Sequence, residues 1–236
     1  MLPAETEKVW NFLQEQPALA GFILGGGSAL ALNIRHRLSE DLDFVYPEIR
    51  LPHQRLEALQ REAASSGFHF ARNDDETAVQ EFAASGLELH DYQQDFLVNQ
   101  KVKVSFFAAD AALRKVLAST NEKVRVATLS ESFKAKCLVS AVRSKTRDWL
   151  DLYLLLKDHG FSILDYRNAF AEAGILSQCH TGLARLCSGV PGSGDEGYHQ
   201  MLASPPTLEE IKTFFISQRD RLEVETAAEA ARVKSN

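Results

Sequence analysis

The sequence GGGSALALNIRHRLSEDLDF at residues 25–44 decides the fold class that we predict for this 236-residue chain. Residues 21–24 precede it as a short apolar run, which predicts a buried strand that ends at the glycines. Residues 28–34 then favour a helix, and residues 41–45 alternate acidic and apolar side chains, which is typical of a strand with one solvated face. The order strand, glycine turn, helix and strand therefore indicates an α/β domain.

Three consecutive glycines, Gly25, Gly26 and Gly27, separate the first strand from the helix. Glycines at this place let the backbone approach a phosphate closely, while the free N–H groups at the start of the helix point at it. The turn is not a P-loop, because no lysine follows at the required spacing, and Leu30 breaks the dinucleotide pattern. Taken alone, the glycines favour a purely structural tight turn.

Asp41 and Asp43 lie two residues apart on the second strand, so both carboxylates leave the same face. Their mutual repulsion is relieved when a divalent cation lies between them, and Mg²⁺ is usually bound by one or two carboxylates together with substrate phosphates. The pair is therefore a candidate site for Mg²⁺ or Mn²⁺. Taken alone, two such acids are also common on a solvated strand.

The combination of these features is more specific than any one of them. Residues 25–44 resemble the signature of the AbiEii/AbiGii toxin-type nucleotidyltransferases, including the spacing of thirteen from Ser28 to Asp41. A second segment, residues 136–153, resembles the same family's pattern Lys…Arg-x-Lys-x-Arg-Asp-x-x-Asp-Leu. Between residues 134 and 147 there are five basic residues and no acid, which favours a cluster that faces phosphate over an ordinary solvated helix face.

The resemblance, which covers roughly residues 20–160, implies the fold and the activity. It implies an α/β (α+β) protein, with a nucleotidyltransferase-fold mixed sheet flanked by helices in residues 1–112 and a helical region packed on it in residues 113–236. It implies Mg²⁺-dependent transfer of a nucleoside monophosphate from an NTP (GTP or ATP) to an RNA or protein hydroxyl. It also implies a toxin-like role, with tRNA as a candidate acceptor and a cognate antitoxin protein as a partner.

The same resemblance assigns roles to residues. It implies that the glycine turn cradles the β and γ phosphates, that the acid pair holds the metal, and that basic side chains bind the triphosphate. Asp148 and Asp151 are expected to orient Lys and Arg side chains rather than to bind metal. The expected catalytic residues are Asp41, Asp43 and Lys136, and the expected nucleotide-binding residues are Gly26, Gly27, Ser28, Arg37, Lys136 and Arg143.

One position departs from the family pattern. Members of this fold usually carry a third carboxylate on a later central strand, and residues 101–107 offer Ser105 there. Serine is a weaker ligand for a hard cation. Either one metal suffices, or Asp91 or Asp95 on the neighbouring strand substitutes, or the protein binds nucleotide without efficient transfer. The last case is the alternative function, a catalytically degenerate module that binds a nucleotide or a partner. We expect Ser105→Asp to strengthen Mg²⁺ binding.

Composition limits the class of protein. A hydrophobic fraction of 45% and a charged fraction of 25% are those of an ordinary globular protein, and a net charge of −6 argues against a surface that binds nucleic acid throughout. No apolar run approaches the roughly 20 residues of a membrane span, and no secretory signal is visible. The cysteines are too few and scattered for a disulfide framework, so we expect reduced thiols in the cytoplasm. They are Cys137, Cys179 and Cys187.

The remaining segments predict further elements. Residues 88–98 and 101–107 predict two strands joined at Asn99 and Gln100. Beyond about residue 110 the pattern is helical, with capping-box starts at Thr128, Ser162 and Thr207. Residues 188–206 are rich in Gly, Ser and Pro and predict a long loop, and the tail from residue 225 is expected to fray.

Overall fold

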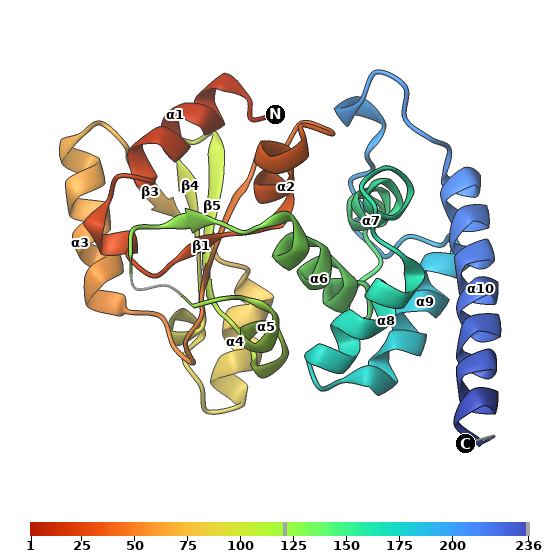
Figure 1. Ribbon diagram of the computed structural model, residues 1–236. Helices are drawn as coiled ribbons and strands as arrows, with labels where there is room; N and C mark the ends of the chain where they lie inside the picture. Colours follow the sequence, from red (N-terminus) through yellow and green to blue (C-terminus); the bar gives the residue numbers. More distant parts are fainter. Residues whose placement is uncertain (120–121, 235–236) are drawn as a thin grey trace. The chain divides into compact units, whose positions relative to one another are not determined.

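The computed structural model describes residues 1–119 and 122–234 and divides into two compact units (Figure 1). The first unit is Met1–Ser132 and the second is Phe133–Asn236. The first extends past residue 112, where the sequence predicted the boundary, because a short strand, β6 (Arg125–Val126), still pairs with the sheet. The prediction that residues beyond 110 are wholly helical is therefore wrong at this strand.

A six-stranded mixed sheet forms the centre of the first unit, with strand order β3-β4-β5-β2-β1-β6. The parallel pairs are β2 with β5 and β1 with β6, and the other neighbours are antiparallel. The predicted mixed sheet is confirmed. The strands before β6 are β1 (Ile23–Leu24), β2 (Leu42–Tyr46), β3 (Phe70–Arg72), β4 (Gln93–Val98) and β5 (Val102–Ala108).

Helices flank this sheet, and most begin where local sequence signals place them. Asp75, for example, caps one helix by accepting hydrogen bonds from the backbone N–H groups of Thr77 and Ala78. The helices and 3₁₀ turns are α1 (Ala4–Leu13), η1 (Pro17–Leu19), α2 (Gly26–Ile34), α3 (His53–Ser65), α4 (Glu76–Ala84), η2 (Leu89–Asp91) and α5 (Ala111–Val116).

The main hydrophobic core lies between one face of the sheet and helices α1 and α3 (Figure 1). Alternate residues of the central strands point into it, and Phe44 of β2 stacks on Phe106 of β5 with ring centroids 5.3 Å apart. Burying each such side chain contributes about 1.5–3 kcal/mol. The other face carries a smaller apolar cluster that includes Ile23, Ala29 and Val45. Because side chains alternate along a strand, Asp43 shares this second face with Val45.

The second unit is helical. The side chains of Trp149 and Phe170 are fully buried in it, and Tyr153 is also buried. A helix that the sequence analysis did not identify, α9, precedes the predicted loop, and α10 continues through the tail that was expected to fray. The elements are α6 (Leu129–Ser140), which begins in the first unit, α7 (Thr146–Asp158), α8 (Ile163–Glu172), η3 (Leu176–Gln178), α9 (Cys179–Ser188), η4 (His199–Met201) and α10 (Leu208–Lys234).

The three predicted capping boxes are confirmed by reciprocal hydrogen bonds, including that of Thr207 with Glu210 at the start of α10. At the start of α6, Thr128 Oγ1 accepts from the backbone N–H of Glu131, whose carboxylate accepts from the backbone N–H of Thr128. Ser162 and Asp165 make the same exchange at the start of α8. Such caps satisfy N–H groups that lack a partner within the helix, and they fix where the helix begins.

Candidate functional site

The glycine turn lies directly against Asp43. Gly25 is the N-cap of α2, and its N–H donates to the backbone carbonyl of Asp43 at 2.8 Å. Gly26 has φ +60°, in the left-handed region that favours glycine, and a Cβ there would overlap the Asp43 carboxylate. Both features require glycine, so the turn brings the start of α2 and the acid side chain together.

Gly27 is required for a different contact. A Cβ on Gly27 would lie 2.5 Å from Arg37 Nη2 and 2.8 Å from Ser39 Oγ. The Arg37 side chain is buried, and its Nη1 donates to the Leu38 carbonyl at 2.8 Å. The structure therefore places the guanidinium of Arg37 beside the glycine turn, where the sequence predicted a phosphate-binding role for both.

Ser28 is buried and its hydroxyl is engaged within the protein. Its Oγ donates to the backbone carbonyl of Asp41 and lies 3.1 Å from Ser39 Oγ. These bonds tie the first turn of α2 to the segment that leads into β2. The group that Ser28 can offer to a phosphate is therefore its backbone N–H at the helix start, while its side chain holds the backbone of Asp41 in place.

Asp41 and Asp43 are both half-buried, one just before β2 and one within it. The Asp43 carboxylate lies against Gly26 and the Arg37 guanidinium lies against Gly27, so an acid and a cation both adjoin the start of α2, where the helix dipole favours anions. Two carboxylates supplemented by phosphate oxygens and water are a usual Mg²⁺ environment. The donor set therefore fits a divalent cation that arrives with a phosphate ligand.

Ser105 lies beside Asp43 in the sheet, and a third carboxylate, Asp95, lies on its other side. Ser105 of β5 pairs directly with Asp43 of β2 on one side and with Asp95 of β4 on the other. Side chains that are paired in this way project from the same face of a sheet. Ser105 Oγ donates to Asp95 Oδ1 at 2.5 Å, and Gln93 Nε2 donates to Asp95 Oδ2 at 2.6 Å.

Of the two substitutes considered for the missing acid, the structure thus brings Asp95 to Ser105. Asp91 is engaged elsewhere, at 2.8 Å from His53 Nε2 and 3.0 Å from Arg50 Nη1. No sequence signal distinguishes Asp95 from Asp91. In the structure Asp91 lies in the 3₁₀ turn η2 before β4 begins at Gln93, whereas Asp95 lies within β4 and pairs with Ser105.

The predicted basic residues of the second unit form a compact ion-pair cluster. Lys136 Nζ lies 2.6 Å from Asp148 Oδ1 and 2.7 Å from Asp151 Oδ2, and Arg143 Nε lies 2.8 Å from Asp148 Oδ2. Burial by itself raises the pKa of Asp148, but the positive charges of Lys136 and Arg143 outweigh it, so the pKa is lowered. The two acids orient Lys136 and Arg143, as predicted.

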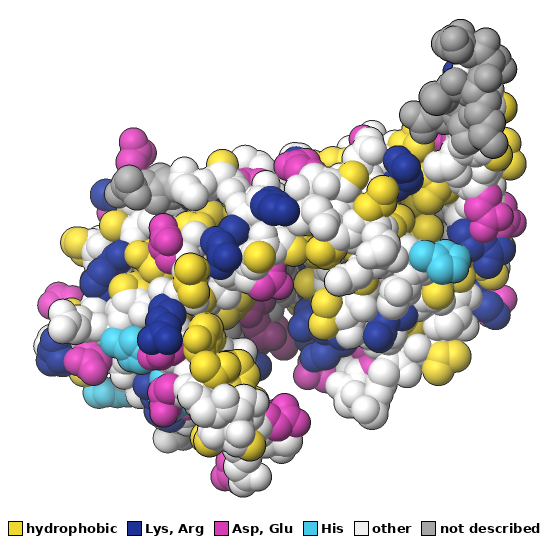
Figure 2. All heavy atoms as spheres, turned by 90° about the horizontal axis from the view of Figure 1, so that it is seen from below, with side chains coloured by type: hydrophobic (Ala, Val, Ile, Leu, Met, Phe, Trp, Pro, Cys, Tyr) yellow, Lys and Arg dark blue, Asp and Glu magenta, His cyan; other side chains and the backbone are white. Residues whose placement is uncertain are grey.

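Within residues 1–119 and 122–234, no group of three or more His, Cys, Asp or Glu side chains is arranged to hold a metal ion. None of the described helices combines the length and apolar character that crossing a bilayer requires. The three cysteines are free thiols. On the face drawn in Figure 2, the coloured side chains show basic and acidic groups interspersed over the surface rather than one patch of a single sign.

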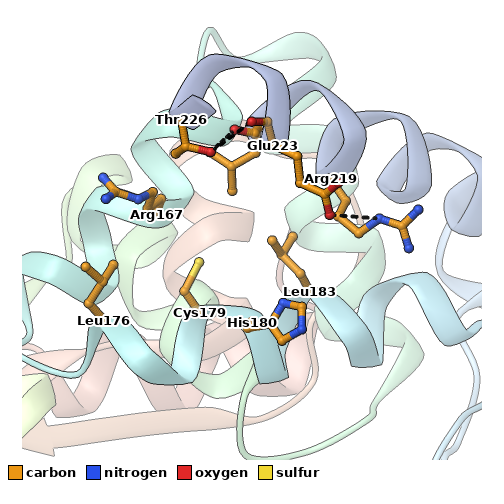
Figure 3. A pocket seen from close by; sticks show the side chains of 9 residues that line it. Arg167, Leu176, Cys179, His180, Leu183, Arg219, Glu223 and Thr226 are labelled. Carbon is orange, nitrogen blue, oxygen red and sulfur yellow. Dashed lines mark hydrogen bonds and ion pairs between the residues drawn. The ribbon is translucent and has the colours of Figure 1, made fainter. Parts of the chain in front are cut away.

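A hollow of about 220 Å³ lies in the second unit, between α8, α9 and α10 (Figure 3). Two of its polar groups already have partners: Arg219 pairs with Asp220 at 2.7 Å, and Thr226 Oγ1 donates to the Leu222 carbonyl at 2.6 Å. Burial raises the pKa of the Cys179 thiol to about 11, so this thiol is a poor nucleophile at neutral pH. The hollow therefore lacks an arrangement for catalysis.

The first unit combines a mixed sheet, a glycine turn at the N-terminus of a helix, and an acid-bearing strand that packs against this turn. This arrangement is that of the nucleotidyltransferase fold. Comparison of the sequence with protein families gives the same class: residues 11–233 match the family described as "Nucleotidyl transferase AbiEii toxin, Type IV TA system". The chain belongs to this AbiEii nucleotidyltransferase family, which confirms the predicted resemblance and extends it over most of the sequence.

Two solved structures from Helicobacter pylori are similar to this chain. One is JHP933, with 18% sequence identity, a TM-score of 0.49, and coverage of 98% of this chain and 99% of that one. The other is provisionally described as a nucleotidyltransferase, with 18% identity, a TM-score of 0.49, and coverage of 93% and 95%. A comparison with curated protein sequences finds no match.

Proposed function

We propose that the protein transfers a nucleoside monophosphate from an NTP, either GTP or ATP, to a hydroxyl group of RNA or protein. Membership of the AbiEii family supports nucleotidyl transfer as the reaction class. The observation that carries the proposal is the contact between Gly26 and the Asp43 carboxylate, because it joins a metal-binding group to a phosphate-binding turn.

Each part of the site has a proposed task. The backbone N–H groups of Gly26, Gly27 and Ser28 bind the β and γ phosphates, and Arg37 adds a fixed positive charge beside them. Asp41 and Asp43 hold Mg²⁺ or Mn²⁺, which when bound neutralises negative charge that develops during phosphoryl transfer.

Lys136 and Arg143 are proposed to bind the triphosphate as well. Asp148 holds both side chains, and Asp151 adds a second contact to Lys136, so both positive groups have defined positions. A fixed cation loses less entropy on binding phosphate than a free surface side chain does. The proposed contribution of these residues is therefore electrostatic, and Lys136 is expected to matter most for the reaction.

The acceptor and the partner follow from the family. A type IV toxin–antitoxin family implies an antitoxin protein as partner, and we propose an RNA hydroxyl, with tRNA as the first candidate, as acceptor. An RNA acceptor of this kind is met in the cytoplasm, which is the proposed location.

Incubation with each α-labelled NTP, Mg²⁺ or Mn²⁺, and total RNA or protein tests the proposal. Label should pass to a macromolecule with wild-type protein and not with Asp43→Asn, while Asp75→Asn, a cap residue of α4, should behave as wild type. Wild-type protein that transfers label to no acceptor with any NTP contradicts the proposal.

The alternative function is a nucleotide- or partner-binding module, and Ser105 at the position of the third carboxylate favours it. Calorimetric titration of GTP and ATP with and without Mg²⁺ separates the two functions. Tight binding that ignores Mg²⁺, together with absent transfer, supports the module.

A further inference from the structure

Asp95 is a buried acid whose hydrogen-bond donors are both neutral. Its carboxylate accepts from the Ser105 hydroxyl at 2.5 Å and from the Gln93 amide at 2.6 Å, and the residue is 5% exposed. Burying a carboxylate without a cationic partner costs free energy. An asparagine would also offer Ser105 an acceptor oxygen and would avoid that cost. The arrangement therefore indicates a use for the charge or the basicity of Asp95.

The position of Ser105 indicates what that use is. Ser105 lies between Asp43 and Asp95 in one row across three neighbouring strands, on the face that also carries the proposed metal-binding acid. Adjacent strands are about 4.8 Å apart. Asp95 is therefore about two strand spacings from Asp43, whereas Ser105 is one spacing from each, and Asp95 Oδ1 is held by the Ser105 hydroxyl.

We propose that Ser105 and Asp95 form a proton relay that deprotonates the acceptor hydroxyl, an inference that rests on the proposed nucleotidyl transfer. The acceptor oxygen attacks the α-phosphorus of the NTP and forms a new P–O bond. The bond between the α-phosphorus and the bridging oxygen breaks, and pyrophosphate leaves with that electron pair. The acceptor proton passes to Ser105 Oγ while the Ser105 proton passes to Asp95 Oδ1.

This relay accounts for a serine at a position where a carboxylate was expected. A serine hydroxyl is too weak a base to act alone. A hydroxyl that is hydrogen-bonded to a carboxylate can accept one proton as it gives up its own proton to the carboxylate. In this chain the carboxylate that accepts the proton, Asp95, lies one strand further from Asp43 than Ser105 does. Ser105 contacts the acceptor and is the catalytic residue of the pair, whereas Asp95 acts through Ser105 and is a positioning residue.

Four variants of the full-length protein test the relay. Asp95→Asn keeps an acceptor oxygen for Ser105 and removes the base, Ser105→Ala removes the link, and Ser105→Thr keeps a hydroxyl. Asp75→Asn, at the exposed cap of α4, is the matched acid-to-amide control. Initial rates of transfer from labelled NTP to RNA or protein are measured against NTP concentration, with the melting temperature recorded for each variant.

We expect Asp95→Asn and Ser105→Ala each to lower kcat about a hundredfold, the usual contribution of general acid–base catalysis, with the KM for NTP nearly unchanged. Ser105→Thr should recover most of the rate, and the double variant should be no worse than either single one, since the two residues act as a unit. A merely structural role would not give this separation of kcat from KM, nor the rescue by threonine.

Three results would overturn the relay. If wild-type protein transfers label and both Asp95→Asn and Ser105→Ala match it, the relay is wrong and the proposed function stands. If wild-type protein transfers nothing, the proposed function and the relay both fail. If label is found covalently on Ser105, that residue is an acceptor rather than a relay. Should Asp95→Asn not fold, Ser105→Ala against Ser105→Thr decides the matter.

Discussion

Buried acids in the two units are compensated in different ways. In the second unit, Asp148 and Asp151 bind Lys136 at 2.6 and 2.7 Å, and their side chains are 3% and 0% exposed. In the first unit, Asp95 is buried almost as deeply, but among the residues that the structure describes its carboxylate accepts hydrogen bonds from a hydroxyl and an amide rather than from a cation.

This difference separates two consequences of burying a charge. An acid paired with a cation supports the fold only while both partners remain, because loss of one leaves the other charge uncompensated. An acid whose hydrogen-bond donors are neutral has no buried cation that depends on it, so its loss is expected to cost less stability. The comparison therefore predicts that the second-unit cluster controls stability more strongly and that the first-unit row controls reactivity.

The largest effect on stability is expected for Lys136→Met, which leaves Asp148 and Asp151 without their shared cation. We expect a loss of about 3–5 kcal/mol in the free energy of unfolding, measured by urea denaturation. Lys134→Met, two residues earlier, removes a more exposed pair with Glu172 and should cost at most about 1 kcal/mol. Equal losses in the two variants would contradict the expectation that the buried ion pairs of the second unit stabilise the fold more than its exposed ones.

Gly27→Val tests the close contact of the glycine turn with Arg37 and Ser39 in the first unit. The new side chain would overlap Arg37 and Ser39, so both the guanidinium and the turn must shift. We expect nucleotide affinity to fall more than about tenfold, or about 1.4 kcal/mol, measured by calorimetry. The control is Gly67→Ala at the end of α3, where an added Cβ meets nothing within 4 Å and only backbone strain is expected. Unchanged affinity in Gly27→Val would mean that the turn is merely structural.

Ser105→Asp brings a second carboxylate against Asp95, which changes the expectation drawn from the sequence. Two adjacent carboxylates repel, so one of them takes up a proton and the fold loses about 1–3 kcal/mol. The single variant should therefore bind Mg²⁺ no more tightly than wild type. Combining it with Asp95→Asn should restore stability and reveal stronger Mg²⁺ binding by titration. A stable single variant with increased Mg²⁺ affinity would show that Asp95 does not oppose the new charge.

Glu131 is expected to give the smallest effect at neutral pH and a visible one in acid. Burial raises its pKa, but hydrogen bonds from Arg125 and from the backbone N–H groups of Ala118 and Thr128 outweigh burial and lower the pKa to about 2. Because the folded-state pKa lies below the ordinary value of 4.5, the stabilisation is present above pH 4.5 and is lost as the pH falls towards 2.

Unfolding curves of Glu131→Gln and wild type between pH 6 and 2 test this prediction. The variant should be less stable near neutral pH, and its stability should decline less as the pH falls, because the wild-type carboxylate is no longer there to be protonated. Parallel pH dependence in the two proteins would show that the Arg125 contact does not depend on the charge of Glu131.

Much of the secondary structure was predictable because its signals are local. The capping boxes at Thr128 and Ser162 each depend on residues within one helical turn, and the alternation around Asp43 depends on residues within one strand. The two-residue strand β6 was missed, since two residues carry no periodicity and β6 exists only through pairing with β1. The helix α9 was likewise not identified.

The sequence by itself determined the family, the glycine turn and the paired acids, because these features lie in short segments whose residue types and spacing are readable directly. Only the tertiary structure decided that Asp95 rather than Asp91 stands beside Ser105, and that the Ser28 side chain binds backbone instead of facing a ligand. The physical reason is that strand register depends on pairing between distant segments. A shift of one residue turns a side chain to the opposite face of the sheet.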